Sequence, residues 1–145
     1  DAAAVIALTN ADLWPGGSWN FVFGLASLSR RVGVWSLARL GDPTRENVLS
    51  RRFLWRTIRT AAHECGHLLR IRHCTRYECG MNGANGLTEF DSQPLEFCPE
   101  CQAKIQLISN PDCNTRYRAL SEFARRYGLE RELAYWQKAT TATTA

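Results

Sequence analysis

Residues 63–74 have the sequence HECGHLLRIRHC, which contains all three histidines of the chain. In an α-helix, residues four positions apart lie about 40° apart around the axis and roughly 6 Å apart along it. His63 and His67 can therefore direct their rings at one metal ion. Glu64, about 100° around the helix from His63, can accept a proton from a water bound there. This H-E-x-x-H spacing is typical of the zinc site of a peptidase.

His73 is the candidate third ligand. On an unbroken helix it would be turned about 240° from His67 and could not reach the same ion. The chain must therefore bend near residues 70–72, with Arg70 in a left-handed conformation that costs about 1–2 kcal/mol. A downstream carboxylate, Glu89 or Asp91, is the alternative third ligand, and two ordinary helix histidines near a core are the alternative to any metal site.

Four cysteines form a second cluster of candidate ligands. They stand in two closely spaced pairs: Cys74, Cys79, Cys98 and Cys101. Such pairs separated by a loop are the usual way to close a tetrahedral structural zinc site, and this site would hold the poorly patterned segment 70–94 in place. Disulfide bonds are the alternative. We expect Cys65 to pack in the core and Cys113 to be a partly exposed free thiol without a role.

The rest of the sequence predicts a mixture of strands and helices. Apolar and aromatic runs indicate a buried strand over residues 2–8 and a hairpin formed by 19–28 and 32–40. Apolar positions at three- and four-residue steps predict a helix over 50–69, capped by Ser50 or Asn47. Further helices are expected over 94–108, 114–127 and 129–138. We expect one domain over 1–139 and a disordered tail over 140–145.

Composition excludes several classes of protein. The chain has 145 residues, 45% of them hydrophobic and 22% charged, as in an ordinary globular domain. It has no apolar run of the roughly 18 residues that a membrane span needs. The net charge is only +4 and the basic residues are scattered. Nucleic-acid binding through Arg51, Arg52, Arg56 and Arg59 is therefore a minor alternative.

The complete pattern is H-E-x-x-H-x-x-R-x-x-H-C-x4-C-x-M-x16-C-x2-C. It resembles the archaemetzincin family of zinc metallopeptidases, which carries glycine in place of Arg70 and a slightly longer spacer before the third cysteine. Residues 20–24 and 32–36 also resemble the hairpin of that family. The resemblance implies an α+β, compact metzincin-like fold with a twisted mixed sheet, an active-site helix, a Met-turn and a small zinc-stapled helical C-terminal part. It also implies an N-terminally truncated domain.

The resemblance further implies roles for individual residues. Two zinc ions are expected, with Glu64 as general base and Met81 in the Met-turn. The catalytic zinc would be held by His63, His67 and His73, and the structural zinc by Cys74, Cys79, Cys98 and Cys101. Independently of the resemblance, Tyr77 is a candidate for stabilising the oxyanion.

The expected function is hydrolysis of peptide bonds. The edge of the hairpin would pair with an extended peptide or small protein substrate. The alternative is a catalytically impaired peptide-binding module, because Arg70 replaces the usual glycine. We expect a monomer without nucleic-acid or membrane partners. Zinc thiolates favour a reducing interior, cytoplasmic or nuclear.

Overall fold

The computed structural model describes residues 2–41, 51–109 and 112–142. Within these residues, three strands precede five helices: β1 (Val5–Thr9), β2 (Gly24–Ala26), β3 (Val32–Ser36), α1 (Arg51–Leu68), α2 (Leu87–Ser92), α3 (Pro99–Ser109), α4 (Cys113–Tyr127) and α5 (Glu130–Ala142). The chain forms two compact units, Asp1–Ile105 and Gln106–Ala145. The sheet and both candidate metal centres belong to the first unit.

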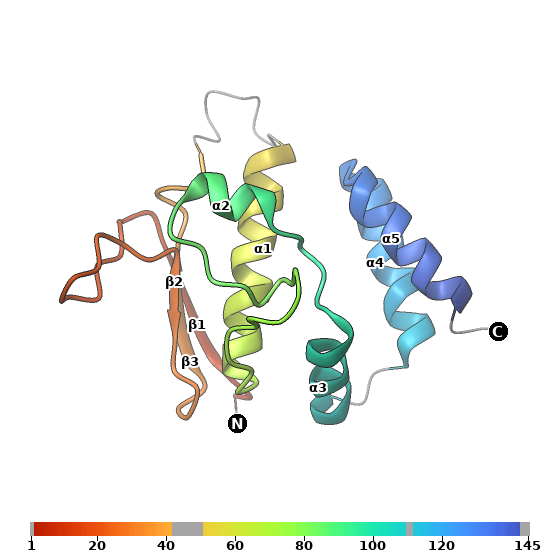
Figure 1. The fold of residues 1–145 in the computed structure, drawn as a ribbon, viewed down its shortest axis with the longest axis horizontal. Helices are drawn as coiled ribbons and strands as arrows, with labels where there is room; N and C mark the ends of the chain where they lie inside the picture. The colour runs from red at the N-terminus through yellow and green to blue at the C-terminus, as the bar shows by residue number, and fades with distance from the viewer. Residues whose placement is uncertain (1, 42–50, 110–111, 143–145) are drawn as a thin grey trace. The chain divides into compact units, whose positions relative to one another are not determined.

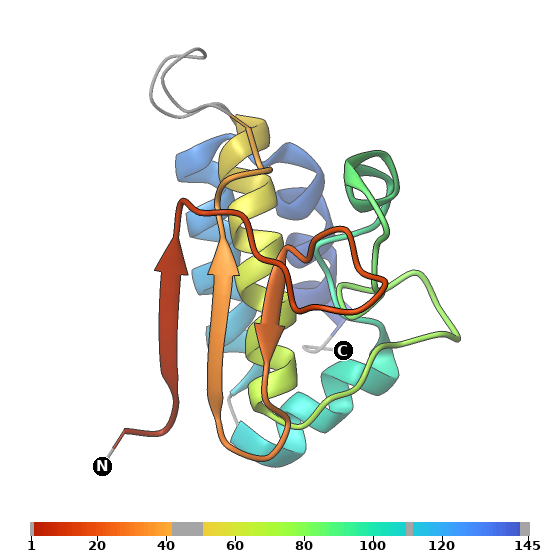
Figure 2. The same ribbon diagram turned by 90° about the vertical axis from the view of Figure 1, so that its left-hand side faces the viewer.

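The sheet is mixed, in the order β1-β3-β2 (Figure 2). The central strand β3 pairs in parallel with β1 and antiparallel with β2. The antiparallel pair is the predicted hairpin, but only Gly24–Ala26 of its first arm is a strand. Residues 27–31 connect the two strands, and Arg31 takes φ 54° there. β2 is therefore a short edge strand of the sheet.

The strand predicted over residues 2–8 is present as β1, but the prediction that it is buried is wrong. Val5 and Leu8 are 59% and 61% exposed. β1 pairs with β3 on one side only, and α1 packs against β3 and β2. An apolar run thus predicted the strand correctly, but it carries no information about which layer covers it.

Helix α1 packs across one face of the sheet (Figures 1 and 2). Its bounds agree with the predicted helix to within one residue, while the predicted caps Ser50 and Asn47 lie outside the described residues. Its buried side chains are mostly polar: Arg56, Arg59, Thr60, His63, Glu64 and Leu68. Burial of polar groups requires partners, so this face of α1 indicates a site as well as a core.

The segment after α1 contains a helix that the sequence did not predict, α2. Its Phe90 is buried, with ring centroids 4.8 Å from Phe23 and 6.1 Å from Trp55. The following helix begins at Pro99, five residues later than predicted. Residues 94–98 are non-helical and are held to a neighbouring turn, where Gly80 N–H donates to the Glu96 carbonyl at 2.7 Å.

The second unit is a pair of packed helices, α4 and α5. Asp112 caps α4 by accepting from Thr115 N–H, and Gly128 ends it in the left-handed conformation with φ 66°, as is usual for a C-terminal glycine. α5 continues to Ala142, so residues 140–142 of the expected tail are helical. Residues 143–145 lie outside the described residues.

Candidate metal centres

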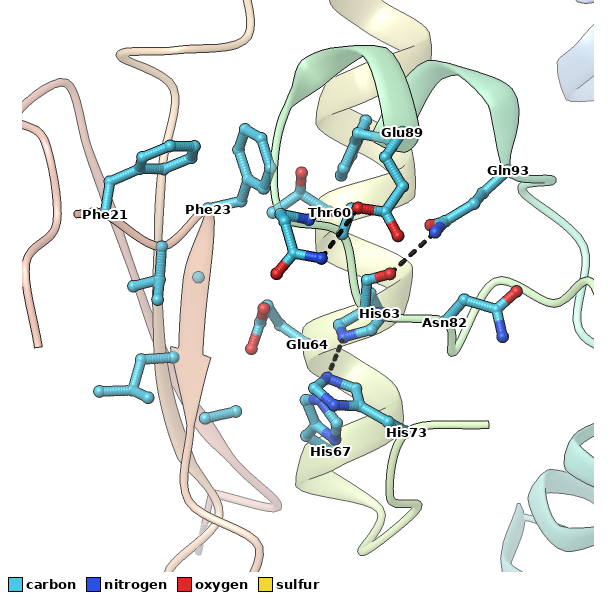
Figure 3. Close-up of a pocket in the computed structure, with 18 of the residues that line it drawn as sticks. Phe21, Phe23, Thr60, His63, Glu64, His67, His73, Asn82, Glu89 and Gln93 are labelled. Carbon is cyan, nitrogen blue, oxygen red and sulfur yellow. Dashed lines mark hydrogen bonds between the residues drawn. The ribbon is translucent and has the colours of Figure 1, made fainter. Parts of the chain in front are cut away.

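The three histidines converge on one point at the C-terminal end of α1 (Figure 3). One ring nitrogen from each of His63, His67 and His73 lies within 4.8 Å of the others. The Nε2 atoms of His63 and His73 are 3.2 Å apart. Two imidazole nitrogens on one tetrahedral zinc stand about 3.3 Å apart, given zinc–nitrogen bonds of about 2.0–2.1 Å. The donor set and its spacing therefore fit this ion.

A sharp bend after α1 brings His73 to this point. Arg70 has φ 64°, the left-handed conformation that the sequence predicted. Arg70 N–H donates to the His67 carbonyl at 2.8 Å, and Ile71 N–H donates to the Gly66 carbonyl at 2.9 Å. This pair of bonds is a Schellman motif, in which glycine usually occupies the left-handed position. Arginine occupies it here at a cost of about 1–2 kcal/mol.

Backbone carbonyls fix the orientation of two of the rings. His63 Nδ1 donates to the Gly80 carbonyl at 2.9 Å, and His67 Nδ1 donates to the Ile71 carbonyl at 2.7 Å. The Nε2 lone pair of each ring is then left for a ligand, which is how metal-binding histidines are usually held. Burial lowers the pKa of His63 to about 3 and also lowers that of His67. Both rings are therefore neutral at neutral pH, as metal binding requires.

Glu64 lies beside the histidines and reaches toward β2. Its side chain packs so closely on this strand that a Cβ added to Gly24 would overlap Glu64 Oε1. The residue is buried, and its Oε2 has no hydrogen-bond partner among the described residues. Burial raises its pKa to about 7. A carboxyl group in this state can take up and release a proton near neutral pH.

Met81 packs under the helix that carries the first two histidines. It is completely buried, and a Cβ added to Gly66 would overlap its sulfur. The turn around it is closed by Asn82 N–H donating to the Cys79 carbonyl at 2.9 Å. Gly66 is therefore required for the close approach of Met81 to α1.

The histidines and Glu64 line a cavity of about 1160 Å³. One wall is apolar and comes from the segment around β2, including Phe21 and Phe23 (Figure 3). The opposite wall is polar and includes Asn82 and Gln93. This volume is sufficient for several side chains of an extended peptide.

The four predicted cysteines form a second group whose sulfur atoms lie within 4.8 Å of one another: Cys74, Cys79, Cys98 and Cys101. All six cysteines of the chain are free, so the disulfide alternative is not observed. The Cys74 and Cys98 sulfurs are 3.9 Å apart, and thiolates on one tetrahedral zinc stand about 3.8 Å apart, given zinc–sulfur bonds of about 2.3 Å. The cluster fits a closed four-thiolate zinc site.

Backbone N–H groups point at this cluster. Cys98 and Met81 donate to the Cys79 sulfur at 3.2 and 3.4 Å. Burial raises the pKa of Cys79 and Cys101. At Cys74, burial is outweighed by N–H groups of Arg76 and Tyr77, and its pKa is lowered. Buried thiols of this kind become thiolates when a cation compensates their charge.

Cys65 and Cys113 lie outside both groups and are half-buried. The alternative third ligands are engaged elsewhere. Asp91 forms an ion pair with Arg56 at 2.5 Å, and Glu89 accepts from Asn85 N–H at 2.7 Å. Neither carboxylate belongs to the histidine group.

Two further predictions from the sequence concern residues other than the candidate metal ligands and Glu64. Tyr77 is half exposed and is not among the residues that line the cavity, so the structure does not support its role at the oxyanion. Arg56 and Arg59 are buried, which removes two of the four arginines proposed for nucleic-acid binding.

Sequence reasoning missed Arg59 as part of this region. Its guanidinium donates to the Asn82 and Pro94 carbonyls, each at 3.3 Å, and to the Gln93 side chain. It also lies 4.1 Å from the centroid of the Phe90 ring. Burial lowers its pKa to about 10. Its position one helical turn before His63 was the available signal, because an arginine there faces the same side of α1.

Comparisons with known proteins all point to one family of peptidases. Residues 2–107 match the model of Peptidase family M54. Archaemetzincin-2 of Mus musculus is 38% identical over 146 residues, and the archaemetzincin of Thermococcus kodakarensis is 34% identical over 109 residues. These alignments cover 83% and 72% of this chain, and 41% and 56% of the relatives. The chain thus matches about half or less of the length of these relatives.

Solved structures of similar proteins share the fold. The archaemetzincin of Methanopyrus kandleri superposes with a TM-score of 0.65 at 33% identity, covering 77% of this chain and 58% of that one. The archaemetzincin of Archaeoglobus fulgidus, complexed with malonate, gives 0.62 at 33% identity, covering 70% and 60%. Both confirm the α+β fold predicted from the sequence. No helix within the described ranges is both long and apolar enough to span a membrane.

Proposed function

The chain belongs to peptidase family M54, the archaemetzincins, and from this premise we propose that it is a zinc-dependent peptidase. The observation that carries the proposal is the convergence of three imidazole nitrogens beside a buried carboxyl oxygen without a partner among the described residues. His63, His67 and His73 would hold the catalytic zinc. Three protein ligands leave a position for water or substrate, as in catalytic rather than structural zinc sites.

The proposed mechanism assigns a separate role to each residue around the histidine centre. When bound, zinc polarises a carbonyl oxygen and lowers the pKa of a bound water toward about 7. Glu64 would accept the proton of the attacking water and pass it to the leaving amine, because its carboxyl group lies beside the histidines and its Oε2 has no partner among the described residues. The Gly80 and Ile71 carbonyls hold two of the rings in the ligating tautomer.

The free edge of β2 is the proposed site for the backbone of the substrate. β2 ends the sheet, and Gly24 on it lies against Glu64. An extended peptide paired with this edge would therefore pass beside the general base, and main-chain hydrogen bonds need only an unpaired strand edge. The substrate would be a peptide or a small protein.

The cysteine cluster would hold a second, structural zinc, with four protein ligands and no position left for substrate. Met81 would form the Met-turn beneath the histidines. We also propose that the protein acts as a monomer, in the cytoplasm or the nucleus, without nucleic-acid or membrane partners.

The decisive test is Glu64→Gln. We expect peptide hydrolysis to fall by about 10²–10⁴-fold, because general base catalysis is lost, while the metal content per chain stays unchanged. The assay is a digest of a peptide library with the zinc-loaded chain, alongside metal analysis. Unchanged hydrolysis in the variant would overturn the mechanism. A wild-type chain that binds both metal ions and cleaves no peptide would instead favour the impaired binding module.

A further inference from the structure

The turn formed by residues 79–83 lies between the two candidate metal centres and contacts both. We propose that the cysteine cluster positions the histidine centre through this turn, so that metal in the cysteine site strengthens metal binding by the histidines. This inference rests on the proposed function for the identity of the two sites. It assigns Cys79 and Gly80 as positioning residues for His63.

The first contact is a hydrogen bond from the ring of a ligand. His63 Nδ1 donates to the Gly80 carbonyl at 2.9 Å, and Gly80 directly follows Cys79 in the chain. Gly80 has little freedom to move, because its N–H donates to Glu96 and a Cβ added to it would stand 2.7 Å from the Leu95 carbonyl oxygen. The position of Cys79 therefore sets the position of the carbonyl that orients His63.

Two more contacts join the same turn to the histidine centre. Met81 packs under α1 at Gly66, between the first two histidines in sequence. Gly83 lies against the third, since a Cβ on Gly83 would stand 3.5 Å from His73 Cε1. The turn thus touches the ring of His73, supplies the bond partner of His63 and packs on the helix that carries His63 and His67.

The other side of the turn is anchored in the cysteine cluster. Cys79 is completely buried and accepts from the N–H groups of Cys98 and Met81. Asn82 ties the turn to the first cysteine by donating to the Cys74 carbonyl at 2.7 Å. Cys74 directly follows His73 in the sequence and donates its N–H to the Met81 carbonyl at 3.0 Å.

A metal ion bound by four sulfurs would fix both ends of this arrangement at once. Without it, the turn is held by hydrogen bonds and packing alone. Gly80 and the segment around Glu96, to which its N–H is bonded, can then shift together relative to His63. Loss of such an outer partner of a metal ligand typically costs about 10–100-fold in metal affinity. Coupling between two binding sites is reciprocal, so histidine occupancy must strengthen the cysteine site by the same factor.

Cobalt(II) is the probe that separates the two sites. Bound to four thiolates it gives sulfur charge-transfer absorption in the near ultraviolet, which a histidine site lacks. We expect Cys101→Ser to raise the Kd for Co²⁺ at the histidine centre by about 10–100-fold, although Cys101 contacts none of the three histidines by hydrogen bond. Cys113→Ser, outside the cluster, is the matched control and should leave this Kd unchanged.

A histidine-site Kd within about twofold of wild type in folded Cys101→Ser would overturn the inference. If circular dichroism shows that this variant does not fold, the reciprocal measurement decides. The Kd of the cysteine site in His67→Ala should be higher, by the same factor, than in wild type whose histidine site is filled with metal, and an unchanged Kd in this comparison overturns the inference. Hydrolysis enters neither measurement. A chain that binds Co²⁺ with coupling but cleaves no peptide would refute the proposed function alone.

Discussion

The two candidate metal centres differ in how they close. The cysteine centre has four ligand side chains, three of them buried, and its last ligand lies in the first turn of α3. The histidine centre has three ligand side chains, and one of them, His73, is exposed. All three line the cavity. Zinc sites with four protein ligands are usually structural, and sites with three protein ligands leave one coordination position for water or substrate. Ligand number and exposure, rather than ligand affinity, therefore separate the proposed roles of the two centres.

The largest expected effect of breaking one centre while keeping the other is on activity. His67→Ala removes one of three ligands, so we expect hydrolysis to fall at least about 10⁴-fold, which is roughly 5.4 kcal/mol of activation free energy. The cysteine site should still bind metal, although more weakly than in the wild type because of the proposed coupling between the centres. Steady-state kinetics with metal analysis test this, and a variant that retains wild-type activity would show that His67 is not a ligand.

Cys101→Ser should have its largest effect on stability. Loss of the four-sulfur site removes an ion that binds only the folded chain, and such an ion contributes about 4 kcal/mol when present at roughly 1,000 times its Kd. We therefore expect the free energy of unfolding in zinc-containing buffer to fall by about that amount. Urea denaturation measures it, with Cys113→Ser as the control. Equal stability of the two variants would contradict a structural metal at this cluster.

Gly24→Ala tests whether activity depends on the position of Glu64 beside the histidine centre. The new methyl group would overlap Oε1, Cδ and Cγ of Glu64, so the whole Glu64 side chain must move away from β2. We expect kcat/KM to fall by about 10–100-fold, or roughly 1.4–2.7 kcal/mol, with unchanged metal content and melting temperature. Gly86→Ala, where a new Cβ meets nothing within 4 Å and which does not line the cavity, is the matched control and should keep kcat/KM near that of the wild type. Unchanged kcat/KM in Gly24→Ala would show that catalysis does not depend on the position of Glu64 against β2.

Arg70→Gly should have the smallest effect. Glycine relieves the left-handed conformation, which costs about 1–2 kcal/mol for arginine, but it also gives the unfolded chain more freedom. We expect a net stabilisation of about 1 kcal/mol, measured by urea denaturation, and hydrolysis within about twofold of wild type. An increase in activity of about tenfold or more would mean that Arg70 impairs the natural centre.

The sequence alone predicted most of the candidate site because its chemistry is local. His63, Glu64 and His67 share one helix whose period places them together, and the position of His73 required a bend that Arg70 does supply. The two cysteine pairs predicted their own convergence by their spacing. The helix α1 was predicted to within one residue for the same reason, since its apolar positions repeat at helical steps.

Features that depend on contacts distant in sequence were not predicted. The exposure of β1 follows from its place at the sheet edge, and α2 exists because Phe90 packs on Phe23 and Trp55. The buried role of Arg59 depends on carbonyls more than twenty residues away. None of these leaves a periodic signal in the local sequence.

The side chains that can bind metal and accept a proton could be identified from the sequence, because spacing along one helix and between paired cysteines places those groups together locally. The burial of Glu64 against β2, the orientation of His63 by Gly80 and the turn between both centres depend on tertiary contacts. Burial and hydrogen bonding are properties of segments brought together by folding. For this reason the proton affinity of Glu64 and the proposed coupling between the centres follow from the tertiary structure alone.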